Sequence, residues 1–128
     1  MRVVVVDDDS GVRAFAKRVL ELAGHSVEES QDGARLLALI DADRPDVIVT
    51  DIFMPEVDGY QLLRLVAAKC PEVPVVVISG GSASMGDQHM NVARLLNAAR
   101  VLQKPFTAAA LLDAVTSAAL DSPVSSGR

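Results

Sequence analysis

Residues 47–59 read VIVTDIFMPEVDG, and this stretch decides the fold. Its first three residues, Val47 to Val49, are uniformly apolar, which is typical of a central parallel β-strand covered on both faces of its sheet. The apolar run ends at Asp51, and Asp58-Gly59 then predicts a turn before a helix that begins at Tyr60. Because a buried parallel strand needs helices on both faces of the sheet, this stretch predicts an α/β protein.

Short apolar runs alternate with longer stretches of helical spacing along the rest of the chain. Five strands and five helices in alternation predict a doubly wound, three-layer (βα)5 sandwich around a five-stranded parallel sheet. The expected strands are residues 3–6, 26–29, 47–49, 74–79 and 101–102, and the expected helices are residues 12–22, 34–40, 60–68, 92–99 and 108–120.

Capping residues and polarity refine this pattern. Ser10 is a predicted N-cap of the first helix, and Thr107 of the last. Gly24 is expected to end the first helix in a left-handed conformation. The strand at residues 26–29 is polar, which predicts that it lies at an edge of the sheet.

The composition limits the kinds of protein to which this chain can belong. Its 128 residues, 50% of them hydrophobic, suffice for one domain with a buried core. No apolar run approaches the roughly 20 residues that cross a bilayer, and no secretory signal follows Met1. We therefore expect a cytoplasmic protein without membrane insertion. The single Cys70 excludes an internal disulfide, and a net charge of −5 argues against direct binding to nucleic acid.

Charged and hydroxyl side chains follow four of the predicted strands. Asp7 and Asp8 follow the first strand, Asp51 ends the third, Ser79 ends the fourth and Lys104 follows the fifth. Ligands of such sheets bind beyond the carboxyl ends of the strands, so these residues should converge on one site. Clustered carboxylates require a countercharge, and Mg²⁺ suits them because it prefers oxygen ligands. The pattern suggests a phosphorylation site.

At these residues the chain resembles the receiver domains of two-component response regulators, a family that includes the chemotaxis regulator and has a flavodoxin-like fold. The resemblance covers about residues 2–120. The matching motifs are Val6-Asp7-Asp8 with Arg13 downstream, Asp51 with Met54-Pro55 and Asp58-Gly59, Ser79-Gly80, and Lys104-Pro105-Phe106.

The resemblance implies a function and a role for each residue of the site. Asp51 would take a phosphoryl group from a sensor histidine kinase or a histidine phosphotransfer protein. Asp8 and Asp51 would bind Mg²⁺ directly, Asp7 largely through water, and the backbone carbonyl of Phe53 would complete the protein ligands. Lys104, whose peptide bond to Pro105 would be cis, would pair with Asp51 and then with the phosphoryl group. The Ser79 hydroxyl would donate to a phosphoryl oxygen. The chain would catalyse only its own phosphorylation and dephosphorylation.

The expected organisation is a receiver domain at residues 1–121 and a polar, disordered tail at residues 122–128. Met1 and the tail favour a complete protein, with a piece of a longer regulator or hybrid kinase as the alternative. Since no effector domain follows the last helix, we expect the output to pass to a downstream protein. The expected surface is formed by the helix at 92–99, the strand at 101–102 and the last helix.

Several alternatives stay open at this point. The chain could be a phosphorelay intermediate or phosphate sink, or a receiver-like interaction module that is never phosphorylated. An aspartyl phosphohydrolase would usually carry a second Asp at position 53, where this chain has Phe53. A nucleotide-binding Rossmann domain would need a Gly-rich turn where Asp7-Asp8-Asp9 stands. If the first strand ended one residue later, Asp8 and Asp9 would be the acidic pair; otherwise Asp9 only complements the helix dipole.

Three features depart from the family pattern. Ser79 stands where threonine is more usual, which keeps the hydroxyl donor. Val101 stands where many members carry the tyrosine or phenylalanine that turns inward on activation, so switching by that route is in doubt. Residues 80–86 are rich in Gly and Ser and lengthen the loop after the fourth strand, which we expect to be mobile.

Overall fold

The fold is a three-layer α/β sandwich, described by a computed structural model for residues 1–51, 53–54, 57–79 and 100–120. Five parallel strands form one sheet in the order β2-β1-β3-β6-β7. This is the strand order of flavodoxin-like proteins, and the order in which strands are added to the sheet reverses between β1 and β3. The strands are β1 (Arg2–Val6), β2 (Ser26–Ser30), β3 (Val47–Asp51), β6 (Val75–Ser79) and β7 (Arg100–Gln103).

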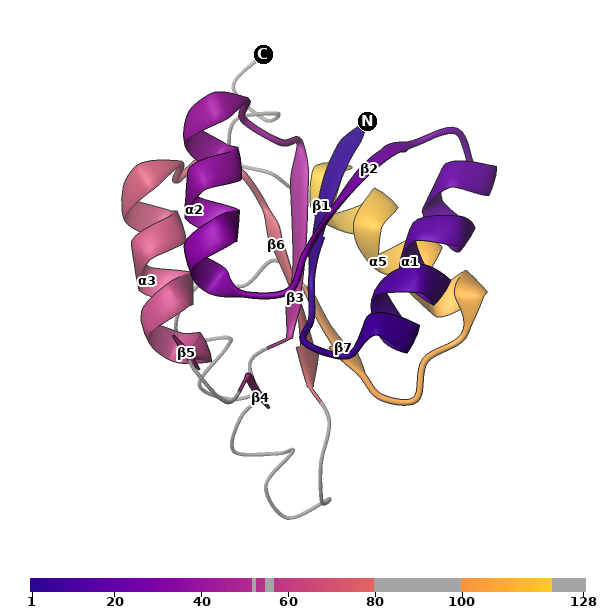
Figure 1. Cartoon of the computed structure of the whole chain (residues 1–128). Helices are drawn as coiled ribbons and strands as arrows, with labels where there is room; N and C mark the ends of the chain where they lie inside the picture. Colours follow the sequence, from indigo (N-terminus) through magenta and orange to yellow (C-terminus); the bar gives the residue numbers. More distant parts are fainter. Residues whose placement is uncertain (52, 55–56, 80–99, 121–128) are drawn as a thin grey trace.

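Helices cover both faces of this sheet. In Figure 1, α2 and α3 lie on one face, and α1 and α5 lie on the other. The bounds are α1 (Ser10–Leu22), α2 (Gly33–Ala42), α3 (Gly59–Lys69) and α5 (Ala108–Leu120). The α/β class and the parallel sheet predicted from the sequence are confirmed, and the polar strand β2 lies at an edge as predicted. The helix predicted at residues 92–99 and the tail at 122–128 lie outside the described residues.

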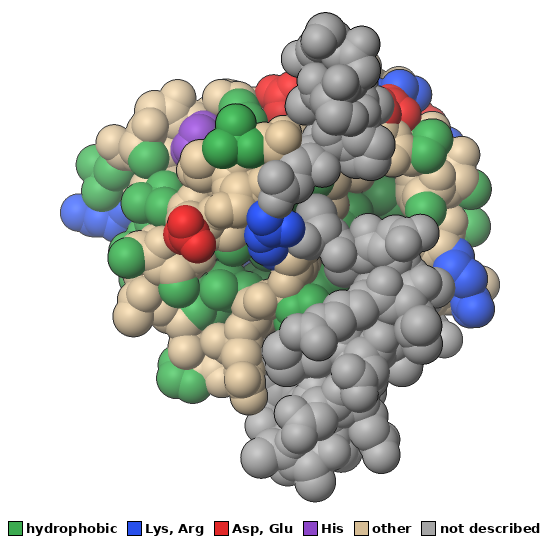
Figure 2. Space-filling model, turned by 180° about the vertical axis from the view of Figure 1, so that it is seen from behind, with side chains coloured by type: hydrophobic (Ala, Val, Ile, Leu, Met, Phe, Trp, Pro, Cys, Tyr) green, Lys and Arg blue, Asp and Glu red, His purple; other side chains and the backbone are tan. Residues whose placement is uncertain are grey.

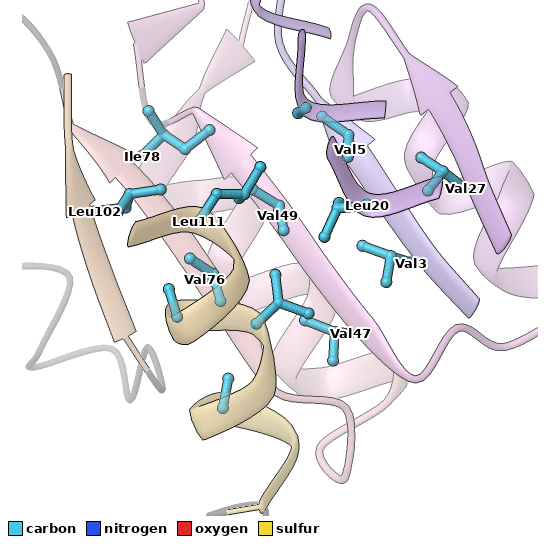
Figure 3. Packing of buried hydrophobic residues seen from close by; sticks show 14 residues of the cluster. Val3, Val5, Leu20, Val27, Val47, Val49, Val76, Ile78, Leu102 and Leu111 are labelled. Atoms are coloured by element: carbon cyan, nitrogen blue, oxygen red, sulfur yellow. The ribbon is translucent and has the colours of Figure 1, made fainter. Parts of the chain in front are cut away.

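The hydrophobic core has two halves because successive side chains of a strand point to opposite faces of the sheet. Val4 and Val6 of β1 face α2 and α3, whereas Val3 and Val5 face α1 and α5. Figure 3 shows the second half, where Leu111 of α5 lies against side chains of the central strands. Each fully buried aliphatic side chain contributes about 1.5–3 kcal/mol to folding, so the three central strands fix the framework on which the site is built.

The first helix begins differently from the prediction. Ser10 is the first residue of α1, and its N-cap is Asp9, so the assignment of the cap to Ser10 was wrong. The Asp9 carboxylate accepts hydrogen bonds from the backbone N–H groups of Gly11 and Val12 at 2.8 and 3.3 Å. Asp9 prevails because its backbone is extended and its carboxylate reaches two unpaired N–H groups of the first turn.

Other local predictions are confirmed. Gly24 has φ +96°, a left-handed conformation that suits glycine, directly after the C-cap Ala23. Oγ1 of Thr107 accepts a hydrogen bond from the N–H of Ala110 at 3.1 Å and thereby caps α5. The peptide bond between Lys104 and Pro105 is cis, as the family resemblance implied.

The segment after β3 differs from the predicted turn. Two short antiparallel strands, β4 (Phe53–Met54) and β5 (Val57–Asp58), form a hairpin there, and Gly59 is already the first residue of α3. The turn predicted at Asp58-Gly59 was therefore wrong. A two-residue strand is too short to leave a periodic signal in the sequence.

Ion pairs fasten the amino edge of the sheet, the edge opposite the carboxyl ends of the strands. Arg2 of β1 pairs with Glu28 of β2 and with Asp43, which follows α2. Two more pairs join α2 and its following loop to α3 and its following loop: Asp41 with Lys69, and Arg44 with Glu72. None of the described helices is long and apolar enough to cross a membrane.

Candidate functional site

The carboxyl edge of the sheet brings together three of the residues predicted for the site. Asp7 follows β1, Asp51 ends β3 and Lys104 follows β7, and the three strands lie in one sheet. Nζ of Lys104 lies 3.1 Å from Oδ2 of Asp51 and 3.1 Å from Oδ2 of Asp7. The Asp7 side chain is fully buried, that of Asp51 is 5% exposed and that of Lys104 is 27% exposed. One ammonium group therefore bridges two buried carboxylates.

Asp8 completes an acidic cluster with Asp7 and Asp51. One carboxylate oxygen from each of these residues lies within 4.8 Å of the others, with Asp8 exposed. The Oδ2 atom of Asp7 is buried, and its partner among the described residues is the ammonium group of Lys104. Three carboxylates that face one ammonium group leave an excess of negative charge, which fits a hard divalent cation such as Mg²⁺.

Comparison with known proteins agrees with this arrangement. The family model of the response regulator receiver domain matches residues 3–116. The chain belongs to this family. The receiver domain of NtrX from Brucella abortus has 30% sequence identity and a TM-score of 0.85, over 94% of this chain and 99% of that one. The chemotaxis protein CheY4 of Vibrio cholerae has 26% identity and a TM-score of 0.82, over 91% and 97%.

A curated relative adds a more similar but shorter match. The response regulator MprA of Mycolicibacterium vanbaalenii is 42% identical over 79 residues, which cover 62% of this chain and 34% of the relative. Its namesake from Mycobacterium avium is 40% identical over the same length, which is 35% of that protein. The match thus spans about a third of these two relatives, both of which are named response regulators.

The pKa of Asp7 is raised in the acidic cluster of the receiver domain. Burial raises this pKa above its ordinary value, and the neighbouring Asp51 carboxylate raises it further. The N–H of Asp9 and the ammonium group of Lys104 act in the opposite direction but do not cancel the rise. The fold therefore holds an ionised Asp7 at a cost, which a bound cation would remove.

The pKa of Lys104 is also shifted. Burial alone would lower it, but the contacts of the ammonium group with Asp51 and Asp7 outweigh burial, and the pKa is raised. Lys104 is therefore fully charged at neutral pH. The receiver domain needs this charge, because without it only carboxylates would face one another at this point.

Asp9 takes no part in the acidic cluster. Its carboxylate binds the N–H groups at the start of α1, and its own N–H donates to Oδ1 of Asp7 at 2.9 Å. Because β1 ends at Val6, the residues that meet Asp51 are Asp7 and Asp8. The geometry favours this pair over the alternative pair of Asp8 and Asp9.

Two further residues predicted for the site are placed only by their backbones. Ser79 is the last residue of β6, where it is in register with Gln103, the residue before Lys104. Phe53 begins β4, two residues after Asp51. Both positions lie at the carboxyl edge of the receiver sheet, next in sequence or in register to residues of the cluster.

One contact at the site was not predicted. Nη1 of Arg13, in the first turns of α1, donates to the backbone carbonyl of Asp7 at 2.5 Å. The sequence placed Arg13 within a family motif, but gave it no role. The sequence signal for this contact is an arginine six residues after Asp7, and this spacing does not indicate that the arginine binds the backbone carbonyl group of Asp7.

An open, mostly apolar hollow of about 440 Å³ lies beside the cluster. Phe15 on α1 is 43% exposed there, and its ring contacts the Phe106 ring with a centroid distance of 6.0 Å. The hollow joins the start of α1 to the segment after β7, and Lys104 is shared between it and the acidic cluster. Its lining residues are Asp9, Gly11, Val12, Phe15, Lys104, Pro105 and Phe106.

Proposed function

We propose that this receiver domain accepts a phosphoryl group on Asp51 from a phosphohistidine of a sensor histidine kinase or a histidine phosphotransfer protein. The single observation that carries the proposal is the bridge from Lys104 to both buried carboxylates, 3.1 Å from each. A lysine shared by an acceptor carboxylate and a metal-binding carboxylate can also pair with the negative oxygens of a phosphoryl group when one is added to the acceptor.

In the proposed reaction an Asp51 carboxylate oxygen attacks phosphorus. A new O–P bond forms while the N–P bond of the phosphohistidine breaks, and the leaving imidazole keeps the electron pair and takes up a proton. The result is an acyl phosphate on Asp51 and an unmodified histidine on the donor. Lys104 would move from the Asp51 carboxylate to a phosphoryl oxygen, and the Ser79 hydroxyl would donate to another.

The residues that would hold Mg²⁺ are Asp8 and Asp51 directly, Asp7 largely through water, and the carbonyl group of Phe53. The acidic cluster, with only the ammonium group of Lys104 to balance Asp7 and Asp51, supports this assignment. Bound Mg²⁺ would supply positive charge that offsets the oxygens of the incoming phosphoryl group.

The output is proposed to be a protein contact. The surface predicted to change comprises β7, α5 and residues 92–99, the last of which lie outside the described residues. Val101 of β7 is half-buried against the part of the core that α2 and α3 cover. Because this residue is a valine, no aromatic ring can turn inward there on phosphorylation. In Figure 2, the Lys and Arg side chains on the coloured part of one face lie singly. That nucleic acid is not bound directly stays a prediction from the net charge of −5.

The proposed organisation is a receiver domain at residues 1–121 with a polar tail at 122–128, acting in the cytoplasm. The family match at residues 3–116 supports a receiver domain over most of residues 1–121. Because the match spans about a third of MprA, what the whole of such a regulator does stays a proposal for this chain. A role as a phosphorelay intermediate or phosphate sink uses the same chemistry and differs only in the next acceptor.

The test is the intact mass of the wild type and of Asp51→Asn after incubation with acetyl phosphate, with Mg²⁺ or with a chelator. We expect one added phosphoryl group in the wild type with Mg²⁺ only, and none in the variant. Modification of Asp51→Asn would show that the acceptor is another residue. An unmodified wild type would favour the receiver-like interaction module.

A further inference from the structure

The side chain of Arg13 on α1 reaches the backbone of the acidic loop between β1 and α1. Its guanidinium donates to the carbonyl of Asp7, and its own side chain is only 15% exposed. A charged donor and a neutral acceptor form a stronger hydrogen bond than two neutral groups, and low exposure limits competition from water.

Asp7 is thereby held at all four of its polar groups. Its N–H donates to the Ser30 carbonyl at 3.1 Å, its carbonyl accepts from Arg13, and its Oδ1 accepts from Asp9 at 2.9 Å. Its Oδ2 forms the ion pair with Lys104 at 3.1 Å. The loop is therefore fixed so that one oxygen of Asp7 stays directed into the cluster.

Arg13 is itself fixed from a second strand. Its Nε lies 3.5 Å from Oε1 of Glu29 on the edge strand β2, and Nζ of Lys17 lies 3.6 Å from Oε2 of the same carboxylate. Glu29 thus holds two basic residues of α1 and restrains the guanidinium while it binds the carbonyl of Asp7. We call Arg13, Glu29 and Lys17 the α1–β2 ion cluster.

We propose that Arg13 is a positioning residue that sets the metal affinity of the receiver site by holding the loop of Asp7 and Asp8. The inference rests on the proposed function, because it takes the acidic cluster to be the Mg²⁺ site. Groups that orient metal ligands without touching the metal commonly change affinity by about 10- to 100-fold when removed.

The sign of the effect separates positioning from simple electrostatics. Arg13 is a cation near three carboxylates, so electrostatics alone would make the site bind a divalent cation more tightly after its removal. Positioning requires the opposite, since a loop released from Arg13 must be ordered again when the cation binds. Arg13→Ala should therefore weaken binding although it removes a repelling charge.

The experiment measures binding of Mn²⁺ to the full chain from the electron paramagnetic resonance signal of the free ion, with Mg²⁺ competition for affinity. We expect Arg13→Ala to raise the Kd about 10-fold. Arg13→Lys, which keeps a donor and the charge, should recover part of the loss. Arg18→Ala, on the exposed side of the same helix, is the matched control and should leave the Kd unchanged.

A second readout tests whether Arg13 acts only through the loop. At saturating Mg²⁺, the extent of phosphorylation of Arg13→Ala by acetyl phosphate should equal that of the wild type, while the Mg²⁺ concentration for half-maximal modification should rise. Far-ultraviolet circular dichroism without metal establishes that each variant is folded. If Arg13→Ala does not fold, Glu29→Gln carries the test, because it releases the guanidinium and should raise the Kd in the same direction.

Two failures can be told apart. A wild type that binds no Mn²⁺ would overturn the proposed metal site itself. A wild type that binds Mn²⁺ with an Arg13→Ala variant of equal or higher affinity would leave the metal site in place and overturn the role of Arg13.

Discussion

Nζ of Lys104 lies 3.1 Å from Oδ2 of Asp51, although the two residues are 53 positions apart in the sequence. The contact exists because β3 and β7 end at the same edge of the sheet, with β6 between them. The same ammonium group reaches Asp7 beyond β1. The ammonium group of Lys104, directly after β7, thus balances the carboxylates of Asp7 after β1 and of Asp51 at the end of β3.

Lys104→Met should lower the stability of the metal-free protein. Removal of the ammonium group leaves Asp7 and Asp51 facing each other in a buried position, which we expect to cost about 1–3 kcal/mol of the free energy of unfolding. Denaturation by urea in the presence of a chelator measures the change. Adding Asp7→Asn to Lys104→Met should recover part of the loss, and a double variant no more stable than Lys104→Met would contradict the bridge.

Asp7→Asn should have the opposite effect in the absence of metal. The pKa of Asp7 is raised by burial and by Asp51, so folding disfavours its ionised form. An amide of similar shape removes that charge, and we expect a gain on the order of 1 kcal/mol at pH 7. Mg²⁺ should stabilise the wild type more than this variant, because a ligand stabilises only the protein that binds it. Thermal unfolding with and without Mg²⁺ gives both comparisons.

The pH dependence of that gain has a defined sign. Between the ordinary pKa of Asp7, 3.8, and its raised value in the fold, the folded protein binds more protons at this site than the unfolded chain. Stability therefore falls in this window as pH rises, and the advantage of Asp7→Asn should grow through it and then stay constant. Urea denaturation of both proteins across the window, with chelator, tests this; an advantage that shrinks with rising pH would be incompatible with it.

Lys104 gives a second pH window at the alkaline end. Its raised pKa means that the stabilisation by its ion pairs is fully present below the unfolded value near 10.5 and is lost as pH rises through the folded pKa. The difference in stability between wild type and Lys104→Met should thus shrink only above this value. A difference that disappears at neutral pH would show that the contact with Asp51 does not contribute.

Phe15→Asp should separate docking from chemistry. Phe15 is exposed in the hollow beside the cluster and lies apart from the carboxylates, so a donor protein that reaches Asp51 would meet it. Transfer from a phosphorylated histidine kinase or phosphotransfer protein should slow at least about 10-fold, the cost of roughly 1.4 kcal/mol of lost contact. Phosphorylation by acetyl phosphate should be unchanged, and Leu22→Asp, exposed at the far end of the same helix, should affect neither reaction.

Sequence patterns predicted the sheet because valine runs can be buried on both faces only in the centre of an α/β sandwich. They also predicted which residues meet at its carboxyl edge, because parallel strands end together. The N-cap was misplaced because Asp9 and Ser10 are both good caps, and only the backbone geometry chooses between them. The hairpin of β4 and β5 was missed because it holds only two residues in each strand.

Contacts that depend on side-chain reach could not be predicted in the same way. The contact of Arg13 with the Asp7 carbonyl depends on the angle between α1 and β1, which no local pattern encodes. The restraint of Arg13 by Glu29 depends on β2 pairing with β1, a relationship between distant segments. These are the contacts on which the proposed metal affinity depends.

The ion pairs at the amino edge of the sheet have a consequence for how this protein can be altered. Arg2, Arg44 and Lys69 bind their partners at the end of the strands remote from the acidic cluster. The more exposed pairs of Arg44 and Lys69 contribute at most about 1 kcal/mol each, so replacements there change tolerance to heat in small steps. Replacements at these pairs can therefore change heat tolerance without altering a residue of the acidic cluster, whereas replacements of Asp7 or Lys104 change both at once.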